Sequence, residues 1–258
     1  MNSITNAFTN GKAFIAFITA GDPALETTEK LILAIEQAGA DLIEIGIPFS
    51  DPVAEGEAIQ GADRRALAGG ATTDKIFDMV KHVKGKVHIP LVFMTYINPV
   101  FTYGVKRFMQ KCRDCGIAGI IIPDLPFEEK EEVLPACRDY GITLISMIAP
   151  TSNERISIIA AQAEGFVYCV SSLGVTGVRS EITTNIGDMV ALVKKSTNTP
   201  CAIGFGISTS EQARAMAKSA DGVIVGSAIV KLIAQYGTES IQPVYDYVKS
   251  IKQAISKE

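Results

Sequence analysis

The stretch Ala40-Asp41-Leu42-Ile43-Glu44-Ile45 decides the fold. This short apolar run directly follows Gly39, and the segment before it carries Leu31, Ile35 and Ala38 at the spacing of one helix face. Glycine at such a point ends a helix in the left-handed conformation, and an apolar run of this length suits a strand that is buried on both faces of a parallel sheet. The stretch therefore predicts a helix followed by a buried parallel strand.

The same unit recurs along the whole chain. Further strands are predicted at residues 13–19, 89–94, 118–122, 142–147, 166–170, 201–204 and 222–225, and further helix-ending glycines at Gly85, Gly116, Gly141 and Gly165. Eight strands in 258 residues leave about 32 residues for each unit, which is close to the length of one strand-helix-strand unit. The pattern favours an α/β fold in which residues 1–258 form one (β/α)₈ TIM barrel domain, with an open doubly wound sheet as the alternative.

Two units are longer than the others, and we expect extra helical segments and long loops there. Gly39 and Gly85 lie 46 residues apart, and the surplus falls at residues 46–56, just after the second strand. A second surplus follows the sixth strand, at residues 171–185, where Gly174 and Gly177 are candidate hinges of a lid. Both loops leave the carboxyl ends of strands, where barrel enzymes build their active sites.

Composition excludes several classes of protein. The chain has 24 Lys and Arg against 28 Asp and Glu, so it has no basic excess with which to bind nucleic acid nonspecifically. Its longest uncharged run, residues 87–105, contains two prolines and a glycine and does not suit a membrane span. The first residues do not have the pattern of a signal peptide, which favours a cytoplasmic protein. Cys112 and Cys115 are expected to be ordinary helix cysteines.

Carboxylates are the candidate acid-base groups. Glu44 lies near the carboxyl end of the second strand among apolar neighbours, so its side chain faces either the barrel mouth or the helix layer. A carboxyl group in an apolar pocket is suited to act as an acid or base near neutral pH. Glu55, in the long loop, is a second candidate, although a loop glutamate is usually only solvated; Glu57 is expected to be such a case.

Other residues favour a phosphate site and argue against metal chemistry. Asp124 follows the fourth strand and either serves the site or holds a loop through backbone hydrogen bonds. Glycines follow the seventh and eighth strands at residues 204–208 and 226–227, where backbone N–H groups of a barrel often hold phosphate. The only histidines, His82 and His88, precede the third strand at the opposite end of the barrel, so no metal site is expected.

The motifs resemble those of the tryptophan synthase α subunit family along essentially the whole chain. Residues 44–56 read EIGIPFSDPVAEG, which is similar to the family signature; the other matching segments are FITAGDP at 17–23, TYINP at 95–99, PDLP at 123–126, GVTG at 174–177, GFGIS at 204–208 and GSAIV at 226–230. The resemblance implies a cofactor-independent lyase of tryptophan biosynthesis. This enzyme cleaves indole-3-glycerol phosphate by a retro-aldol reaction to indole and glyceraldehyde 3-phosphate.

The resemblance also implies roles for individual residues. Glu44 matches the general acid-base glutamate, and Glu55 matches the carboxylate that accepts a hydrogen bond from the indole N–H group. The substrate-binding residues it implies are Phe17, Tyr96, Ile121, Asp124, Tyr168, Thr176, Gly177, Phe205, Gly206, Gly226 and Ser227. Asp51, Pro52, Asn98 and Pro99 resemble the surface that meets a β subunit in a complex of two α and two β subunits.

Two departures from the family pattern concern the long loops. Glu55 stands where the family usually has aspartate, so its carboxylate reaches farther by one methylene group. Residues 171–173 lack the arginine that many relatives carry before the glycine. The alternatives to the lyase are another phosphosugar-binding barrel enzyme and a noncatalytic activator of a β subunit.

Overall fold

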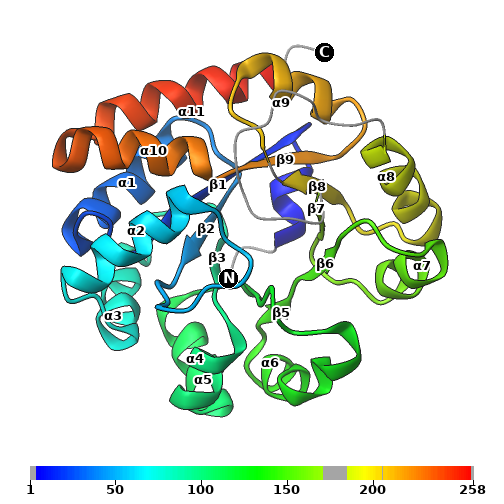
Figure 1. Ribbon diagram of the computed structural model, residues 1–258, viewed down its shortest axis with the longest axis horizontal. Helices are drawn as coiled ribbons and strands as arrows, with labels where there is room; N and C mark the ends of the chain where they lie inside the picture. The colour runs from blue at the N-terminus through cyan, green and yellow to red at the C-terminus, as the bar shows by residue number, and fades with distance from the viewer. Residues whose placement is uncertain (1–3, 171–184, 205, 257–258) are drawn as a thin grey trace.

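A computed structural model describes residues 4–170, 185–204 and 206–256 of the chain. Its centre is a ring of parallel strands, and the helices surround this ring (Figure 1). The strands are β1 (Ala13–Thr19), β2 (Leu42–Gly46), β3 (Leu91–Met94), β4 (Gly119–Ile121), β5 (Thr143–Leu144), β6 (Ser146–Ile148), β7 (Val167–Val170), β8 (Cys201–Gly204) and β9 (Gly222–Val225). The TIM barrel predicted from the strand-helix repeat is confirmed.

The helices form the outer layer. They are α1 (Leu25–Gln37), α2 (Glu57–Ala68), α3 (Thr73–Val83), α4 (Ile97–Tyr103), α5 (Val105–Cys115), α6 (Leu134–Tyr140), α7 (Asn153–Ala161), α8 (Asn185–Ser196), α9 (Ser210–Ala217), α10 (Ser227–Tyr236) and α11 (Ile241–Ile255), with 3₁₀ turns η1 (Ile4–Phe8), η2 (Phe127–Glu132) and η3 (Gly237–Glu239). No helix among the described residues is both long and apolar enough to cross a membrane.

The fifth predicted strand is divided. One run was expected over residues 142–147, but β5 pairs with β4 and β6 pairs with β7, so the sheet order is β5-β4-β3-β2-β1-β9-β8-β7-β6. Ile145 lies between the two halves, and its N–H group donates to the carbonyl of Ile120 at 2.9 Å. The ring therefore closes through a bend of the chain at Ile145, with one half of the broken strand bonded to each neighbour.

The long unit after β2 contains more than a loop. A long loop at residues 46–56 and an extra helical segment were expected here, and α2, which precedes α3, is that additional helix. The ion pair of the buried Asp22 with the partly exposed Arg65 ties α2 to the turn after β1, with two hydrogen bonds of 2.8 and 2.7 Å. This helix is therefore held beside the barrel mouth.

Glycines end helices as the sequence predicts. Gly116 and Gly141 cap α5 and α6 with φ angles of 88° and 66°, in the left-handed region that costs a glycine little. The next strand starts within three residues in both cases. The regular spacing of these stops sets where the strands β4 and β5 enter the sheet.

The barrel interior is closed at its amino-terminal end. Ile4 and Ala7 of η1 are buried in one apolar cluster with Ile15, Leu42 and Phe166 from the strands. Figure 1 shows this dark-blue segment within the ring of strands. Ile4 packs closely against the start of β4, because a Cβ atom on Gly119 would lie 2.7 Å from the Ile4 side chain. The described residues thus pack the amino-terminal half of the interior, and a cavity lies toward the carboxyl ends of the strands.

Asp41 joins the two ends of the chain to the first strands. Its carboxylate accepts hydrogen bonds of 2.7 Å from the Phe14 N–H group and 2.7 Å from the Lys252 ammonium. Lys252 in α11 also donates to the carbonyl of Lys12 at 2.9 Å. These bonds hold α11 against the start of β1 and β2.

We expect Asp41→Ala to lower the free energy of unfolding by about 1–3 kcal/mol, because the half-buried partners of a charged group lose their acceptor. Urea denaturation followed by circular dichroism measures this effect, with Asp139→Ala at an exposed residue of α6 as the control. Equal stability of the two variants would contradict the role given to Asp41.

Candidate functional site

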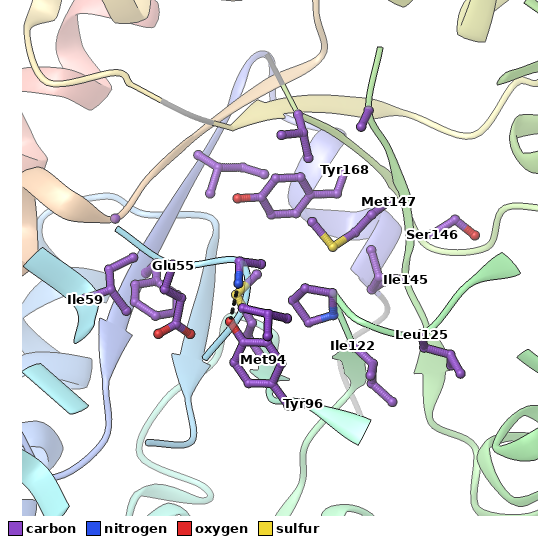
Figure 2. A pocket seen from close by; sticks show the side chains of 18 of the residues that line it. Glu55, Ile59, Met94, Tyr96, Ile122, Leu125, Ile145, Ser146, Met147 and Tyr168 are labelled. Atoms are coloured by element: carbon purple, nitrogen blue, oxygen red, sulfur yellow. Dashed lines mark hydrogen bonds between the residues drawn. The ribbon is translucent and has the colours of Figure 1, made fainter. Parts of the chain in front are cut away.

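A cavity of about 800 Å³ opens at the carboxyl ends of the strands. Figure 2 shows Glu55 and Tyr96 on one side of it and Met147 and Tyr168 across from them. Apart from Glu55, its lining is mainly aromatic and aliphatic at the centre, with Phe17, Ile59, Met94, Tyr96, Ile122, Ile145, Met147, Tyr168 and Ile224, while Gly206, Ser208, Gly226 and Ser227 line it after β8 and β9. The cavity suits a flat apolar group joined to a polar one.

Glu44 faces the barrel interior. Side chains alternate along β2, and Ile43 and Ile45 pack in the helix-facing cluster, whereas Leu42 packs in the interior cluster. Glu44 shares the side of Leu42, which decides between the two orientations left open by the sequence. Its side chain is fully buried, and neither carboxylate oxygen has a hydrogen-bond partner among the described residues. Burial accordingly raises the pKa of Glu44 from its ordinary value of 4.5 to about 8.

Glu44 adjoins the cavity but does not line it. Its register partner on β1 is Phe17, which does line the cavity. Tyr168, another lining residue, lies close to Glu44. Burial raises the pKa of the Tyr168 phenol, and the charge of Glu44 raises it further. The carboxyl group is therefore a neighbour of two rings that face the open space.

Glycines at the strand ends make room for these two rings. A Cβ on Gly46 would lie 2.7 Å from the Phe17 ring, and a Cβ on Gly204 would lie 2.5 Å from the Tyr168 hydroxyl. Any larger residue would push the rings into the cavity. Gly46 and Gly204 do not line the cavity, but the absence of a side chain at these positions leaves room for the Phe17 and Tyr168 rings that do.

Glu55 stands at the wall of the cavity, directly before α2. Burial raises its pKa, while hydrogen bonding to Asp63 and Tyr96 lowers it in part. Its Oε2 atom is buried, and no N–H or hydroxyl group of the described residues lies within hydrogen-bond distance of it. Because Glu55 lines the cavity, its carboxylate is placed to accept a hydrogen bond from an N–H group of a ligand.

Tyr96 fixes the loop that carries Glu55. Its hydroxyl accepts a hydrogen bond of 3.1 Å from the Ala54 N–H group, marked by the dashed line in Figure 2. Its ring lies 5.4 Å from that of Phe49, centre to centre. The residue predicted to flank a ligand therefore also connects the start of α4 to the long loop after β2.

Asp63 was not predicted as part of the site. It lies in α2, only 4% of its surface is exposed, and its carboxyl group is hydrogen-bonded to that of Glu55. Burial, this bond and the charges of Glu55 and Asp22 raise its pKa. One signal was available, because Asp63 falls on the helix face of Ile59 and Ala66 at intervals of four and three residues, where a charged residue is unexpected.

The helix α10 presents its amino-terminal end to the cavity. Gly226 precedes the helix and Ser227 begins it, and both line the cavity together with Gly206. The first backbone N–H groups of a helix have no partner within it and favour an anion. Three of the residues predicted for phosphate binding thus lie together. Thr176, Gly177, Phe205 and residues 171–184 of the predicted lid lie outside the described residues.

Two predicted substrate contacts have other surroundings in the structure. Asp124 does not line the cavity, and its carboxylate accepts a hydrogen bond of 2.9 Å from the Ile97 N–H group at the start of α4. The contact matches the second of the two roles expected for Asp124, in which it holds a loop through a backbone hydrogen bond. Ile121 is fully buried in the interior cluster, and its neighbour Ile122 lines the cavity instead.

The residues predicted for a partner surface lie on two neighbouring segments. Asp51 and Asn98 are exposed, and Pro52 and Pro99 are half-buried. Their segments, the loop after β2 and the first turn of α4, are joined by the contacts of Tyr96 with Ala54 and Phe49. The four residues therefore share one region beside the cavity.

Within the described ranges, no group of three or more His, Cys, Asp or Glu side chains is arranged to hold a metal ion. Cys112 and Cys115 are buried free thiols on α5, as predicted for helix cysteines. The other free thiols are Cys137, Cys169 and Cys201.

The sequence matches the model of one protein family, described as tryptophan synthase alpha chain, over residues 5–256. The tryptophan synthase alpha chain of Lactiplantibacillus plantarum is 50% identical over 256 residues, covering 99% of this chain and 97% of that one. That of Lacticaseibacillus casei is 48% identical over 255 residues, covering 99% and 96%.

Solved structures agree over the same length. Tryptophan synthase subunit alpha from Legionella pneumophila superposes with a TM-score of 0.91 at 35% identity, and the match covers 100% of both chains. A chain of the tryptophan synthase complex from Pyrococcus furiosus gives a TM-score of 0.87 at 35% identity, covering 95% of this chain and 99% of that one. The similarity extends to full length in sequence and in structure.

The burial of Glu44 predicts a pH-dependent stability. Its pKa is about 8 in the folded protein and near 4.5 when exposed, so between these pH values the folded state binds a proton that the unfolded state has lost. Stability then falls as pH rises, by about 1.4 kcal/mol for each pH unit from this group. Glu44→Gln removes this contribution.

We therefore expect the stability of Glu44→Gln, measured relative to the unmodified protein by urea denaturation, to increase as pH rises from about 5 to 8. Glu57→Gln, at an exposed residue of α2, is the control and should show no such trend. If the Glu44→Gln and unmodified proteins keep a constant difference across this range, the buried acid does not hold its proton.

Proposed function

The chain belongs to the tryptophan synthase alpha chain family, and from this membership we propose how its site performs the reaction. It is a carbon-carbon lyase of tryptophan biosynthesis that catalyses the alpha reaction, the cleavage of indole-3-glycerol phosphate to indole and glyceraldehyde 3-phosphate. The observation that carries the mechanism is the fully buried, unpartnered carboxyl group of Glu44 beside an apolar cavity.

Glu44 is the general acid and base of this mechanism. For the carbon-carbon bond to break, indole C3 gains a proton and the glycerol hydroxyl loses one. A carboxyl group with a pKa of about 8 is protonated at neutral pH and still returns to the acid form readily after giving up its proton. Because Glu44 adjoins but does not line the cavity, its side chain approaches the substrate between its neighbours Phe17 and Tyr168.

Glu55 stabilises the charge that develops on the indole ring. As C3 is protonated, positive charge spreads to the ring nitrogen and its N–H group becomes a stronger donor. Glu55 lines the cavity wall, so its carboxylate accepts a hydrogen bond from the ring N–H group of a substrate bound there. A negative group held there favours the transition state over the substrate, since the charge appears only during the reaction.

The two ends of the substrate are bound by different chemistry. Phe17, Tyr96 and Tyr168 supply an apolar slot for the indole ring. Gly206, Gly226 and Ser227 hold the phosphate through the amino-terminal end of α10, which needs no basic side chain. The mildly acidic chain, with a net charge of −4, is therefore compatible with a phosphate ester as substrate.

The assembly follows from the same membership. A Pyrococcus furiosus relative is described as part of an α2β2 tryptophan synthase complex, and we infer that this chain binds a β subunit in the same stoichiometry. The exposed Asp51 and Asn98, with Pro52 and Pro99, form the contact region beside the cavity mouth. The five free thiols and the biosynthetic role support a cytoplasmic location.

We expect Glu44→Gln to lower kcat for indole release by about 10²- to 10⁴-fold, because the amide neither gives nor takes the proton. Purified protein is assayed with indole-3-glycerol phosphate, alone and with a β subunit, and Glu57→Gln is the control. Full activity of Glu44→Gln would refute its assignment. A wild-type chain that never releases indole but stimulates the β reaction would instead be a noncatalytic activator.

We expect Glu55→Asp to lower kcat by about 10-fold or more, although aspartate is the usual family residue, because loss of one methylene withdraws the carboxylate from its present place and small displacements reduce rate strongly. Indole release and binding of indolepropanol phosphate are measured together, so that a change in kcat is separated from a change in binding. A faster Glu55→Asp variant would mean that the longer side chain is a handicap.

A further inference from the structure

Asp63 is a buried carboxyl group without a cation. Three acidic residues of the described chain are almost fully buried: Asp22, Glu44 and Asp63. Asp22 is neutralised by Arg65, and Glu44 belongs to the mechanism above. Within the described ranges Asp63 forms no ion pair, and its side-chain partner is Glu55. A buried acid is costly unless it is protonated or paired, so Asp63 needs an explanation that Arg65 does not supply.

The Asp63–Glu55 contact requires one proton. Two ionised carboxylates accept hydrogen bonds but donate none, so a hydrogen bond between them exists only when one is protonated. Repulsion between two negative charges in contact also disfavours the ionisation of both carboxyl groups, as in other carboxyl pairs. The pair therefore carries one negative charge and shares one proton at neutral pH.

The surroundings decide which residue keeps the proton. Tyr96 accepts a hydrogen bond from Ala54 through its oxygen, which leaves its own proton free for Glu55, so the ionised form of Glu55 is favoured. Asp63 is almost fully buried, and burial together with its contact with Glu55 raises its pKa, although a backbone hydrogen bond from Phe49 lowers it in part. Both conditions favour the neutral form of Asp63, which then donates to Glu55.

The rigid setting of α2 makes this donor stationary. Ile59 and Ala62 of α2 pack with Phe17 and Val230 in one buried cluster, and Arg65 is tied to Asp22. The residues before and after Asp63 in α2 are therefore held in place, Ile59 and Ala62 by packing and Arg65 by its ion pair. Glu55, in contrast, lies in the loop before that helix and has one methylene more than aspartate, so its carboxylate has more conformations to lose.

We propose that Asp63 is a positioning residue for the lyase reaction: its neutral carboxyl group donates a hydrogen bond that holds the Glu55 carboxylate at the cavity wall, where Glu55 receives the substrate N–H group. The inference rests on the proposed role of Glu55. It also accounts for glutamate at this point of the chain, since the longer side chain reaches a partner on α2 that fixes it.

Two substitutions separate the hydrogen bond from the packing. Asp63→Asn keeps the size of the side chain and an N–H donor but cannot ionise, whereas Asp63→Ala removes the donor. Because the Glu55 interaction strengthens as charge develops, loss of its position should reduce kcat more than it changes KM. We expect Asp63→Ala to lower kcat for indole release by about 10- to 100-fold, with KM within about threefold, and Asp63→Asn to keep kcat within about threefold.

The proton itself is followed by infrared spectroscopy, which needs no turnover. In Glu44→Gln protein, where the other protonated acid is removed, a protonated carboxyl band should persist at neutral pH and disappear as pH rises through the pKa of Asp63. The band should be absent at neutral pH from Glu44→Gln/Asp63→Asn. Glu57→Gln is the matched control on the same helix and should change neither activity nor spectrum.

Each outcome decides a separate point. A folded Asp63→Ala protein with unchanged kcat, or a protonated band that survives in the double variant, overturns the proposal. If Asp63→Ala fails to fold, Asp63→Asn and the infrared band still decide it, since a large loss of kcat in Asp63→Asn contradicts a donor role. A wild-type protein that releases no indole refutes the lyase assignment, whereas the infrared result stands or falls independently.

Discussion

The alternation of side chains along a parallel strand is the constraint on which the site depends. Because β2 pairs in register with β1 and β3, Leu42 and Glu44 must face the barrel interior while Ile43 and Ile45 face the helices. A slip of one residue would place the acid in the helix layer and an isoleucine at the site. The hydrogen-bonded sheet thus forces a carboxyl group into an apolar space, and the raised pKa of Glu44 is the electrostatic result.

Stability and chemistry oppose each other at this end of the barrel. Glu44 lacks any partner, and the Glu55–Asp63 pair lacks a cation among the described residues, whereas Asp22 and Asp41, away from the reacting groups, are matched to Arg65 and Lys252. The buried Asp22 and the partly exposed Asp41 each have a cation. The acids beside the cavity are left with protons to hold or share, which is the state that acid-base chemistry uses.

The sequence predicted what depends on local pattern. Glycines at helix ends and apolar strand runs are local signals, and so the barrel, the helix with Cys112 and the placing of Glu44 among apolar residues were foreseeable. The break at Ile145 was not, because it shows only in the pairing of the two halves with different neighbours, β5 with β4 and β6 with β7, which is not a local signal. Asp63 was missed for a related reason: a charged residue in a helix usually faces water, and only the packing of α2 against the mouth shows that this one does not.

The 3₁₀ turn η1 at the start of the chain limits where substrate can enter and products can leave the barrel. Ile4 and Ala7 close one end of the barrel, and side chains fill the interior above them. Among the described residues, substrate and both products therefore pass through the cavity at the other end, and the packed floor offers indole no exit. Whatever covers the mouth of the cavity during turnover therefore determines where the released indole goes next.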